Sequence, residues 1–130
     1  MCVLFEWHDL IGIPFKAGGR DFNGLDCYGL VKLLMQRQGI DLPEFAYADP
    51  HNYSMVDRLI RNQDVAQRLN RPEIGAIVVM SLIPPYEHHL GVVISRNEFI
   101  HIRQNTRVTI SRLDSPLWRD RIMGFYRVRI

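Results

Sequence analysis

The sequence predicts an α+β fold, in which N-terminal helices pack on an antiparallel β-sheet formed by the second half of the chain. Before Pro72, apolar residues recur mainly at helical spacing. After Pro72, they form short runs rich in β-branched and aromatic residues, which are typical of strands. The chain has 130 residues, and this length favours one domain over residues 1–130.

The main helix is expected to begin after Asp26, because a carboxylate there can accept hydrogen bonds from the free amides of the first turn. Gly39 fits the position just after the end of this helix. One stripe along it is apolar and is expected to be buried: Leu30, Val31, Leu34 and Met35. A short helix is predicted at residues 7–11, and a glycine-rich loop follows it.

A further, more exposed helix is predicted between Pro43 and Pro72 from the spacing of five residues: Met55, Leu59, Ile60, Val65 and Leu69. Strands are predicted at residues 77–80, 90–94, 99–102, 108–110 and 125–130. Residues 95–98 can turn the second of these strands back on the third as a hairpin.

The composition is that of an ordinary globular protein, with 47% hydrophobic and 23% charged residues and a net charge of +2. This charge gives no reason to expect a nucleic-acid partner, and the arginines of the C-terminal third are mixed with acids, as on a solvated surface. A binding module for an acidic polymer stays an alternative. No signal peptide and no membrane span are expected, so synthesis in the cytoplasm is predicted.

Cys27 directly follows Asp26 at the predicted helix start, where partial positive charge favours a thiolate, the nucleophilic form of cysteine. The alternative is a small buried apolar residue. A cysteine nucleophile needs a base and a group that orients the base. His89 and His101 lie on predicted strands, and His101 should share a sheet face with Phe99.

Two other uses of these side chains are weaker. One cysteine and two histidines could ligate zinc, but the chain has no paired CxxC and no short HxxxH element. A serine nucleophile lacks the GxSxG turn. We therefore expect no metal and no organic cofactor.

Four segments occur in order along the chain: IGIPFKAGG, DCYGLVKLLMQRQGIDLP, HLGVVI and NEFIHI. Together they resemble the NlpC family of bacterial cell-wall cysteine peptidases, which have a papain-like fold. His89 and His101 are also twelve positions apart, the separation that the family's hairpin usually shows.

The resemblance implies that Cys27 is the nucleophile, His89 the base and His101 the residue that orients His89, with His88 a weaker candidate for the base. It implies substrate contacts at Asp26, Tyr28 and Phe15, although Asp26 could equally act as the helix cap. In a simple hairpin register the two histidines would not face one another, so a bulge or side-chain reach is needed.

The resemblance implies hydrolysis of an amide in peptidoglycan stem peptides, at the bond between D-glutamate and a diamino acid. Tyr28 replaces the usual serine, and Gly75-Ala76 replaces the usual Gly-Asp. An aromatic residue after the cysteine resembles the phage and prophage tail branch, which implies tail proteins as partners and delivery to the wall by a tail. A tail component with little activity, or an amidase or acyltransferase with another substrate, stays open.

Overall fold

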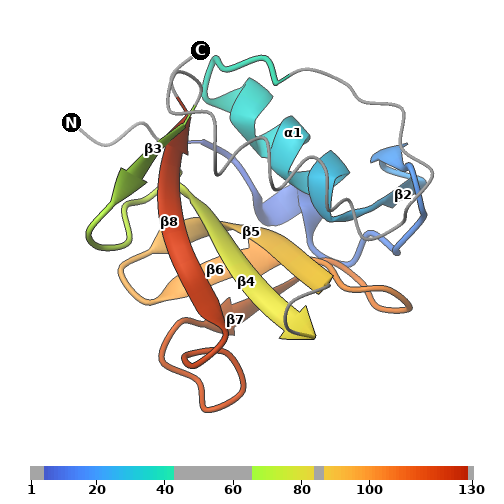
Figure 1. The fold of residues 1–130 in the computed structure, drawn as a ribbon. Helices are drawn as coiled ribbons and strands as arrows, with labels where there is room; N and C mark the ends of the chain where they lie inside the picture. Colours follow the sequence, from blue (N-terminus) through green and yellow to red (C-terminus); the bar gives the residue numbers. More distant parts are fainter. Residues whose placement is uncertain (1–4, 43–65, 84–86, 129–130) are drawn as a thin grey trace.

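In the part of the chain that the structure describes, six antiparallel strands form one curved sheet, and helix α1 (Cys27–Arg37) lies on one face of it (Figure 1). The computed structural model describes residues 5–42, 66–83 and 87–128. In chain order the elements are η1 (His8–Leu10), β1 (Arg20–Asp21), β2 (Gly24–Leu25), α1 (Cys27–Arg37), β3 (Ala66–Leu69), β4 (Ile77–Ile83), β5 (Glu87–Ser95), β6 (Glu98–His101), β7 (Thr109–Arg112) and β8 (Ile122–Val128). The order across the sheet is β3-β8-β4-β5-β6-β7, and β1 and β2 form a separate small hairpin.

Helix α1 has well-defined ends. The Asp26 side chain accepts a hydrogen bond from the amide of Gly29, which satisfies a free donor of the first turn. At the other end Gly39 has φ +82°, and the amide of Ile40 donates to the carbonyl of Met35 at 2.9 Å. This is the Schellman arrangement that a glycine allows after a helix. The predicted cap and stop signals are both confirmed.

Both faces of the sheet are covered. In β4, Ile77 and Val79 belong to the apolar cluster that includes the buried stripe of α1. Val78 and Met80 belong to a second cluster on the opposite face, together with Val93, Phe99, Leu113 and Trp118. The second cluster is completed by the segment between β7 and β8, which explains why β4 is apolar at successive positions instead of alternating.

The fold class is confirmed, and each predicted strand overlaps an observed strand with shifted ends; the last two residues of the strand predicted at 125–130 lie outside the described residues. The helix prediction between Pro43 and Pro72 is wrong at its C-terminal end, because Ala66–Leu69 is strand β3 and pairs with β8. Its other marker residues, Met55, Leu59, Ile60 and Val65, lie outside the described residues. The short helix at residues 7–11 is η1, and the loop before α1 contains the β1–β2 hairpin.

Candidate active site

Cys27 is the first residue of α1 and keeps 8% of its surface exposed. The helix N-terminus provides partial positive charge and free amides at this point, which favours an anion on or near the sulfur. Helix α1 packs on β5, the strand that contains His89, and Cys27 shares an apolar cluster with Leu90. The predicted nucleophile therefore lies at the end of a rigid element beside the histidine strand.

Asp26 is buried and holds this helix end in place. Its Oδ1 accepts from the amide of Gly29 at 2.7 Å and from Nη1 of Arg20 at 2.8 Å, and its Oδ2 accepts from the amide of Gly18 at 2.9 Å. The side chain is 1% exposed. These bonds confirm the capping role of Asp26 and add an ion pair with Arg20, whereas contact with a substrate stays a prediction.

Tyr28 and Phe15, the other two predicted substrate contacts, are placed differently. Tyr28 is fully buried, and the Arg20 guanidinium lies 5.5 Å from the centre of its ring. Phe15 is half-buried and borders a surface hollow of about 820 Å³ between residues 11–15 and 105–109. Neither finding tests a role in substrate binding, which stays a prediction for both residues.

His89 and His101 meet directly in the structure. Nε2 of His89 lies 2.8 Å from Nδ1 of His101, and the two residues are 3% and 2% exposed. In the β5–β6 register Gly91, not His89, lies opposite His101. The histidines are therefore diagonal neighbours on one sheet face, and side-chain reach across the glycine brings them together.

The contact between the histidines uses Nε2 of His89 and leaves Nδ1 as the ring nitrogen that could take a proton from a thiol. Whether Cys27 supplies that proton stays a prediction, as does the role of each predicted site residue. The side chain of His88 lies outside the described residues.

Two further residues surround the pair and were not singled out from the sequence. Trp118 stacks on His89 with ring centres 5.8 Å apart and meets His101 edge-on at 5.0 Å. Oγ of Ser111, on β7, lies 2.8 Å from Nε2 of His101. Trp118 lies in an irregular segment with no periodic signal, and the predicted strand at 108–110 ended one residue before Ser111.

Both histidines are held neutral by their surroundings. Burial, then the neighbouring His101 and Arg103, lower the pKa of His89 well below its usual 6.5. Burial, then Arg103, lower the pKa of His101 to about 4. At neutral pH each ring therefore has one protonated nitrogen and one lone pair, as a proton acceptor requires.

The low histidine pKa values predict a loss of stability in mild acid. In the unfolded chain His101 is protonated below about pH 6.5, whereas in the folded chain its pKa is about 4. Between these two pH values protonation favours the unfolded chain, so the free energy of unfolding should fall as the pH is lowered from 6.5 to 4. His101 should account for about 3 kcal/mol of this fall in the free energy of unfolding. Urea unfolding between pH 7 and pH 4 measures it, and His101→Asn should make the fall shallower by that amount. An unchanged pH dependence in the variant would contradict the assignment.

Gly91 is the residue whose lack of a side chain allows the histidines to meet. A Cβ there would lie 2.9 Å from Cδ2 of Phe99 and 3.2 Å from Cβ of His101. Gly91→Ala is therefore expected to displace His101 and to destabilise the domain by about 1–3 kcal/mol. Chemical denaturation measures the stability, and the His101 ring signals measure the displacement. A fully stable variant with unshifted ring signals would refute this prediction.

The described part of the chain offers no alternative metal centre, since it contains no group of three His, Cys, Asp or Glu side chains placed to hold an ion. Within the same residues, no helix combines the length and apolar character needed to cross a bilayer.

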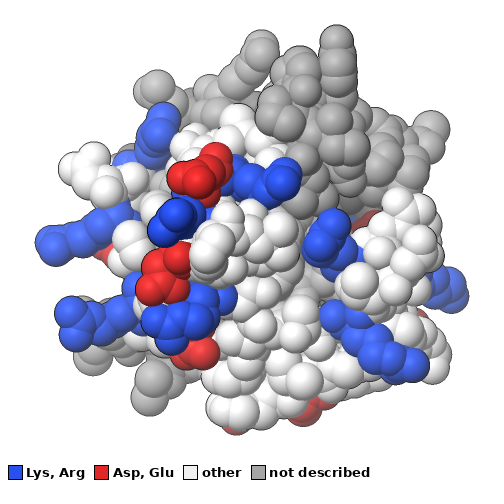
Figure 2. Space-filling model, turned by 90° about the horizontal axis from the view of Figure 1, so that it is seen from below, with Lys and Arg blue, Asp and Glu red and all other residues white. Residues whose placement is uncertain are grey.

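The surface charge is mixed. Figure 2 shows Lys and Arg side chains interspersed with Asp and Glu. Arg112 pairs with Asp114 at 3.0 Å, and Arg127 pairs with Glu73. These pairs favour the solvated-surface interpretation of the C-terminal arginines over a continuous basic track.

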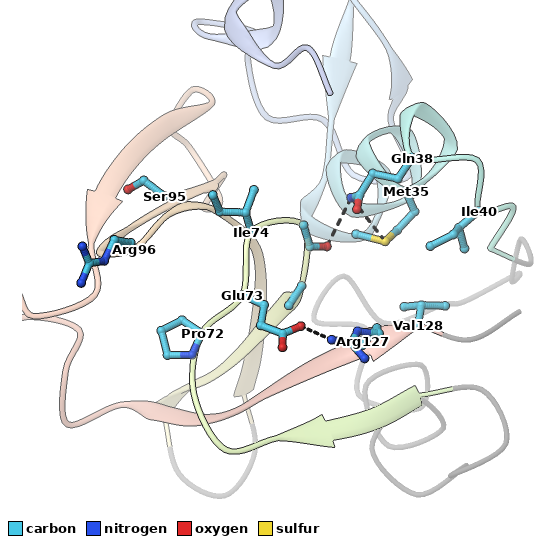
Figure 3. A pocket seen from close by; sticks show the side chains of 12 residues that line it. Met35, Gln38, Ile40, Pro72, Glu73, Ile74, Ser95, Arg96, Arg127 and Val128 are labelled. Atoms are coloured by element: carbon cyan, nitrogen blue, oxygen red, sulfur yellow. Dashed lines mark hydrogen bonds and ion pairs between the residues drawn. The ribbon is translucent and has the colours of Figure 1, made fainter. Parts of the chain in front are cut away.

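A cavity of about 600 Å³ lies at the C-terminal end of α1 (Figure 3). Met35 and Gln38 border it on the helix side, and the Glu73–Arg127 ion pair borders it on the sheet side. The 11 residues of α1 separate it from Cys27 by about 16 Å. It contains none of the predicted site residues.

The chain is similar in sequence to known proteins. Residues 12–127 match the NlpC/P60 family. The murein DD-endopeptidase MepS/murein LD-carboxypeptidase of Escherichia coli K12 is 24% identical over 128 residues, which are 97% of this chain and 61% of that protein. The probable peptidoglycan endopeptidase LytE of Bacillus subtilis is 26% identical over 118 residues, which are 91% of this chain and 31% of that protein.

Solved structures show the same fold. An NLP/P60 family protein from Staphylococcus aureus superposes with a TM-score of 0.66 at 22% identity, covering 94% of this chain and 38% of that one. The NlpC/p60 domain of the peptidoglycan hydrolase SagA gives a TM-score of 0.58 at 18% identity, covering 95% of this chain and 92% of that domain. The papain-like fold is thereby confirmed, and the chain belongs to the NlpC/P60 family.

Proposed function

We propose that this chain is a cysteine peptidase that hydrolyses an amide bond in the stem peptides of peptidoglycan. The observation that carries the proposal is the contact between two buried histidines, His89 on β5 and His101 on β6, with β5 packed against the helix that begins at Cys27. Relatives named as peptidoglycan or murein endopeptidases support the substrate class. The chain spans only 61% and 31% of these two relatives.

The chemistry follows from the three side chains. The Cys27 thiolate attacks the amide carbonyl carbon, while His89 holds the thiol proton as an imidazolium. Amides at the start of α1 stabilise the oxyanion of the tetrahedral intermediate. His89 then protonates the leaving amine, the C–N bond breaks, and a thioester forms. Water, deprotonated by His89, attacks the thioester and releases the acid and the thiol.

The bond that we propose is the one between D-glutamate and the diamino acid. The relatives are named for different bonds: MepS for DD-endopeptidase and LD-carboxypeptidase activities, and another protein of Bacillus subtilis for γ-DL-glutamyl hydrolysis. The substrate should therefore contain all of these bonds, so that the products identify the one cut.

The test incubates the purified protein with cross-linked stem peptides from a diaminopimelate-type wall and identifies the products by mass spectrometry. The Cys27→Ala variant is the control. We expect two new fragments, produced by cleavage between D-glutamate and the diamino acid, with the unmodified protein alone.

Other results would change the proposal. Fragments produced by cleavage at another bond would change the assigned bond, and the chain would still be a peptidase. No cleavage between pH 5 and 9, with a thiol that resists alkylation, would favour a tail component with little activity. Transfer to an added amine in place of hydrolysis would favour an acyltransferase.

We also propose delivery of this chain to the wall as part of a phage or prophage tail, on the strength of the aromatic Tyr28 after the cysteine. Peptide mapping of purified tail particles from the source strain tests this. The chain should copurify with tail proteins through a density gradient, and its absence from such particles would refute tail delivery without affecting the peptidase.

A further inference from the structure

We propose that Ser111 is a positioning residue, which accepts a hydrogen bond from His101 and thereby keeps His89 in the tautomer that can act as a base. This inference rests on the proposed function, since it assigns a role in the same reaction. Ser111 does not touch the reacting atoms. It acts through His101, which it contacts at 2.8 Å.

The three side chains form a continuous line across three strands. His89 lies on β5, His101 on β6 and Ser111 on β7. Ser111 lies opposite Phe99 in the β6–β7 register, so it is a diagonal neighbour of His101, as His89 is on the other side. All three residues point to the same sheet face. His101 therefore uses Nδ1 toward His89 and Nε2 toward Ser111, both at 2.8 Å.

The hydrogen positions in this line are linked, because a neutral imidazole has one donor and one acceptor nitrogen. If Nε2 of His89 donates to His101, then His101 carries its own proton on Nε2 and donates to Ser111. The lone pair of His89 is then on Nδ1, free to accept a proton from a thiol. In the opposite arrangement His101 donates to His89, and Nδ1 of His89 is already protonated.

Ser111 favours the first arrangement by supplying an acceptor. Trp118 lies edge-on to His101, and His101 is 2% exposed, so an Nε2 proton without the serine would be poorly compensated. Buried N–H groups without a partner are rarer in folded proteins than acceptors without one, which indicates that the unpaired donor is the less favourable of the two. Without the hydroxyl, the His101 proton should therefore move to Nδ1, and His89 should lose its basic nitrogen. With Nδ1 of His101 protonated, the imidazolium of His89 would also have no acceptor for its Nε2 proton.

The first test is spectroscopic and needs no substrate. Long-range nitrogen–proton NMR correlations report which ring nitrogen carries the proton. In the unmodified protein at pH 7 we expect His101 protonated on Nε2 and His89 with a free Nδ1. In Ser111→Ala both tautomers should shift toward the opposite arrangement, and Ser111→Thr, which keeps the hydroxyl, should restore the original one. Unchanged tautomers in Ser111→Ala would overturn the proposal.

The second test is kinetic. Ser111→Ala is expected to lower kcat by about 10–100-fold with little change in KM, which corresponds to about 1.4–2.8 kcal/mol. Ser111→Thr should recover most of kcat. The matched control is Ser95→Ala, which removes a hydroxyl that donates to Glu98 at 2.9 Å in the same sheet but does not contact the histidines. Equal losses in Ser95→Ala and Ser111→Ala would indicate general destabilisation and overturn the positioning role.

The two proposals can fail separately. If the unmodified protein cuts no stem peptide, the proposed function fails, while the tautomer measurement still decides whether Ser111 controls the histidines. If stem peptides are cut and Ser111→Ala keeps the same kcat and the same tautomers, the peptidase stands and the role of Ser111 is refuted.

Discussion

Replacing His89 by alanine is expected to lower kcat/KM on stem peptides by about 10³-fold or more, because it removes the group that takes the thiol proton and returns it to the leaving amine. Cys27→Ala should lower it at least as far. The informative variant is the double one. If the two residues act as one unit, the double variant is no slower than the slower single variant. Single-turnover kinetics on a defined stem peptide measure all three.

Independent action would give a different result, since the two losses would then multiply. Such a result would contradict the predicted pairing of Cys27 with His89. His8→Ala is the matched control, because His8 is an exposed histidine in η1 whose ring Nδ1 contacts Glu6 at 2.7 Å, outside the histidine pair. Its activity should match that of the unmodified protein.

Replacing Gly29 by alanine is expected to have the largest effect on stability. A Cβ at this position would lie 2.1 Å from the carbonyl oxygen of Gly19 and 3.2 Å from Oδ1 of Asp26. A backbone atom cannot move aside as a side chain can, so the first turn of α1 must shift. Overpacking of this kind costs about 3 kcal/mol or more, which lowers the melting temperature by about 10 °C.

The destabilisation expected for Gly29→Ala is opposite in sign to the usual effect of replacing glycine by alanine in a helix. Within a helix, alanine is normally favoured over glycine by about 1 kcal/mol. Calorimetry compares Gly29→Ala with Gln36→Ala, a substitution at an exposed position of the same helix. The comparison separates the steric clash at Gly29 from the helix propensity of alanine. Gln36→Ala should leave the melting temperature nearly unchanged. A stabilised Gly29→Ala variant would show that the loop before α1 does not hold the helix end as the structure indicates.

Local signals were enough to predict α1 and every strand of the described sheet except β3. Asp26 and Gly39 mark the ends of α1 through interactions within a few residues, and β4 and β5 are apolar runs of strand length. Strand β3 was missed because Ala66–Leu69 pairs with β8, far along the chain, and its sequence has little β-branched character. Tertiary pairing overrides a weak helical pattern in such cases.

The candidate site residues were predicted from the family resemblance, whereas the contacts that loops make around them were not predicted. The resemblance to the NlpC family implied that His101 orients His89, whereas the hairpin register alone does not bring the two rings together; the structure shows them 2.8 Å apart through side-chain reach across Gly91. The ion pair of Arg20 with Asp26 and the position of Trp118 depend on how irregular segments return to the sheet. No periodicity or spacing in the sequence predicts where these irregular segments pack against the sheet.

The tryptophan beside the two histidines also gives this protein an internal optical reporter. A protonated imidazole quenches indole emission much more strongly than a neutral one, and Trp118 lies within 5.8 Å of the ring centres of both His89 and His101. The chain's other indole, Trp7, stacks on the separate His8 ring at 3.7 Å. With Trp7 replaced by phenylalanine, the fluorescence of the folded protein would follow the charge of the histidine pair alone, without a label and in the presence of substrate.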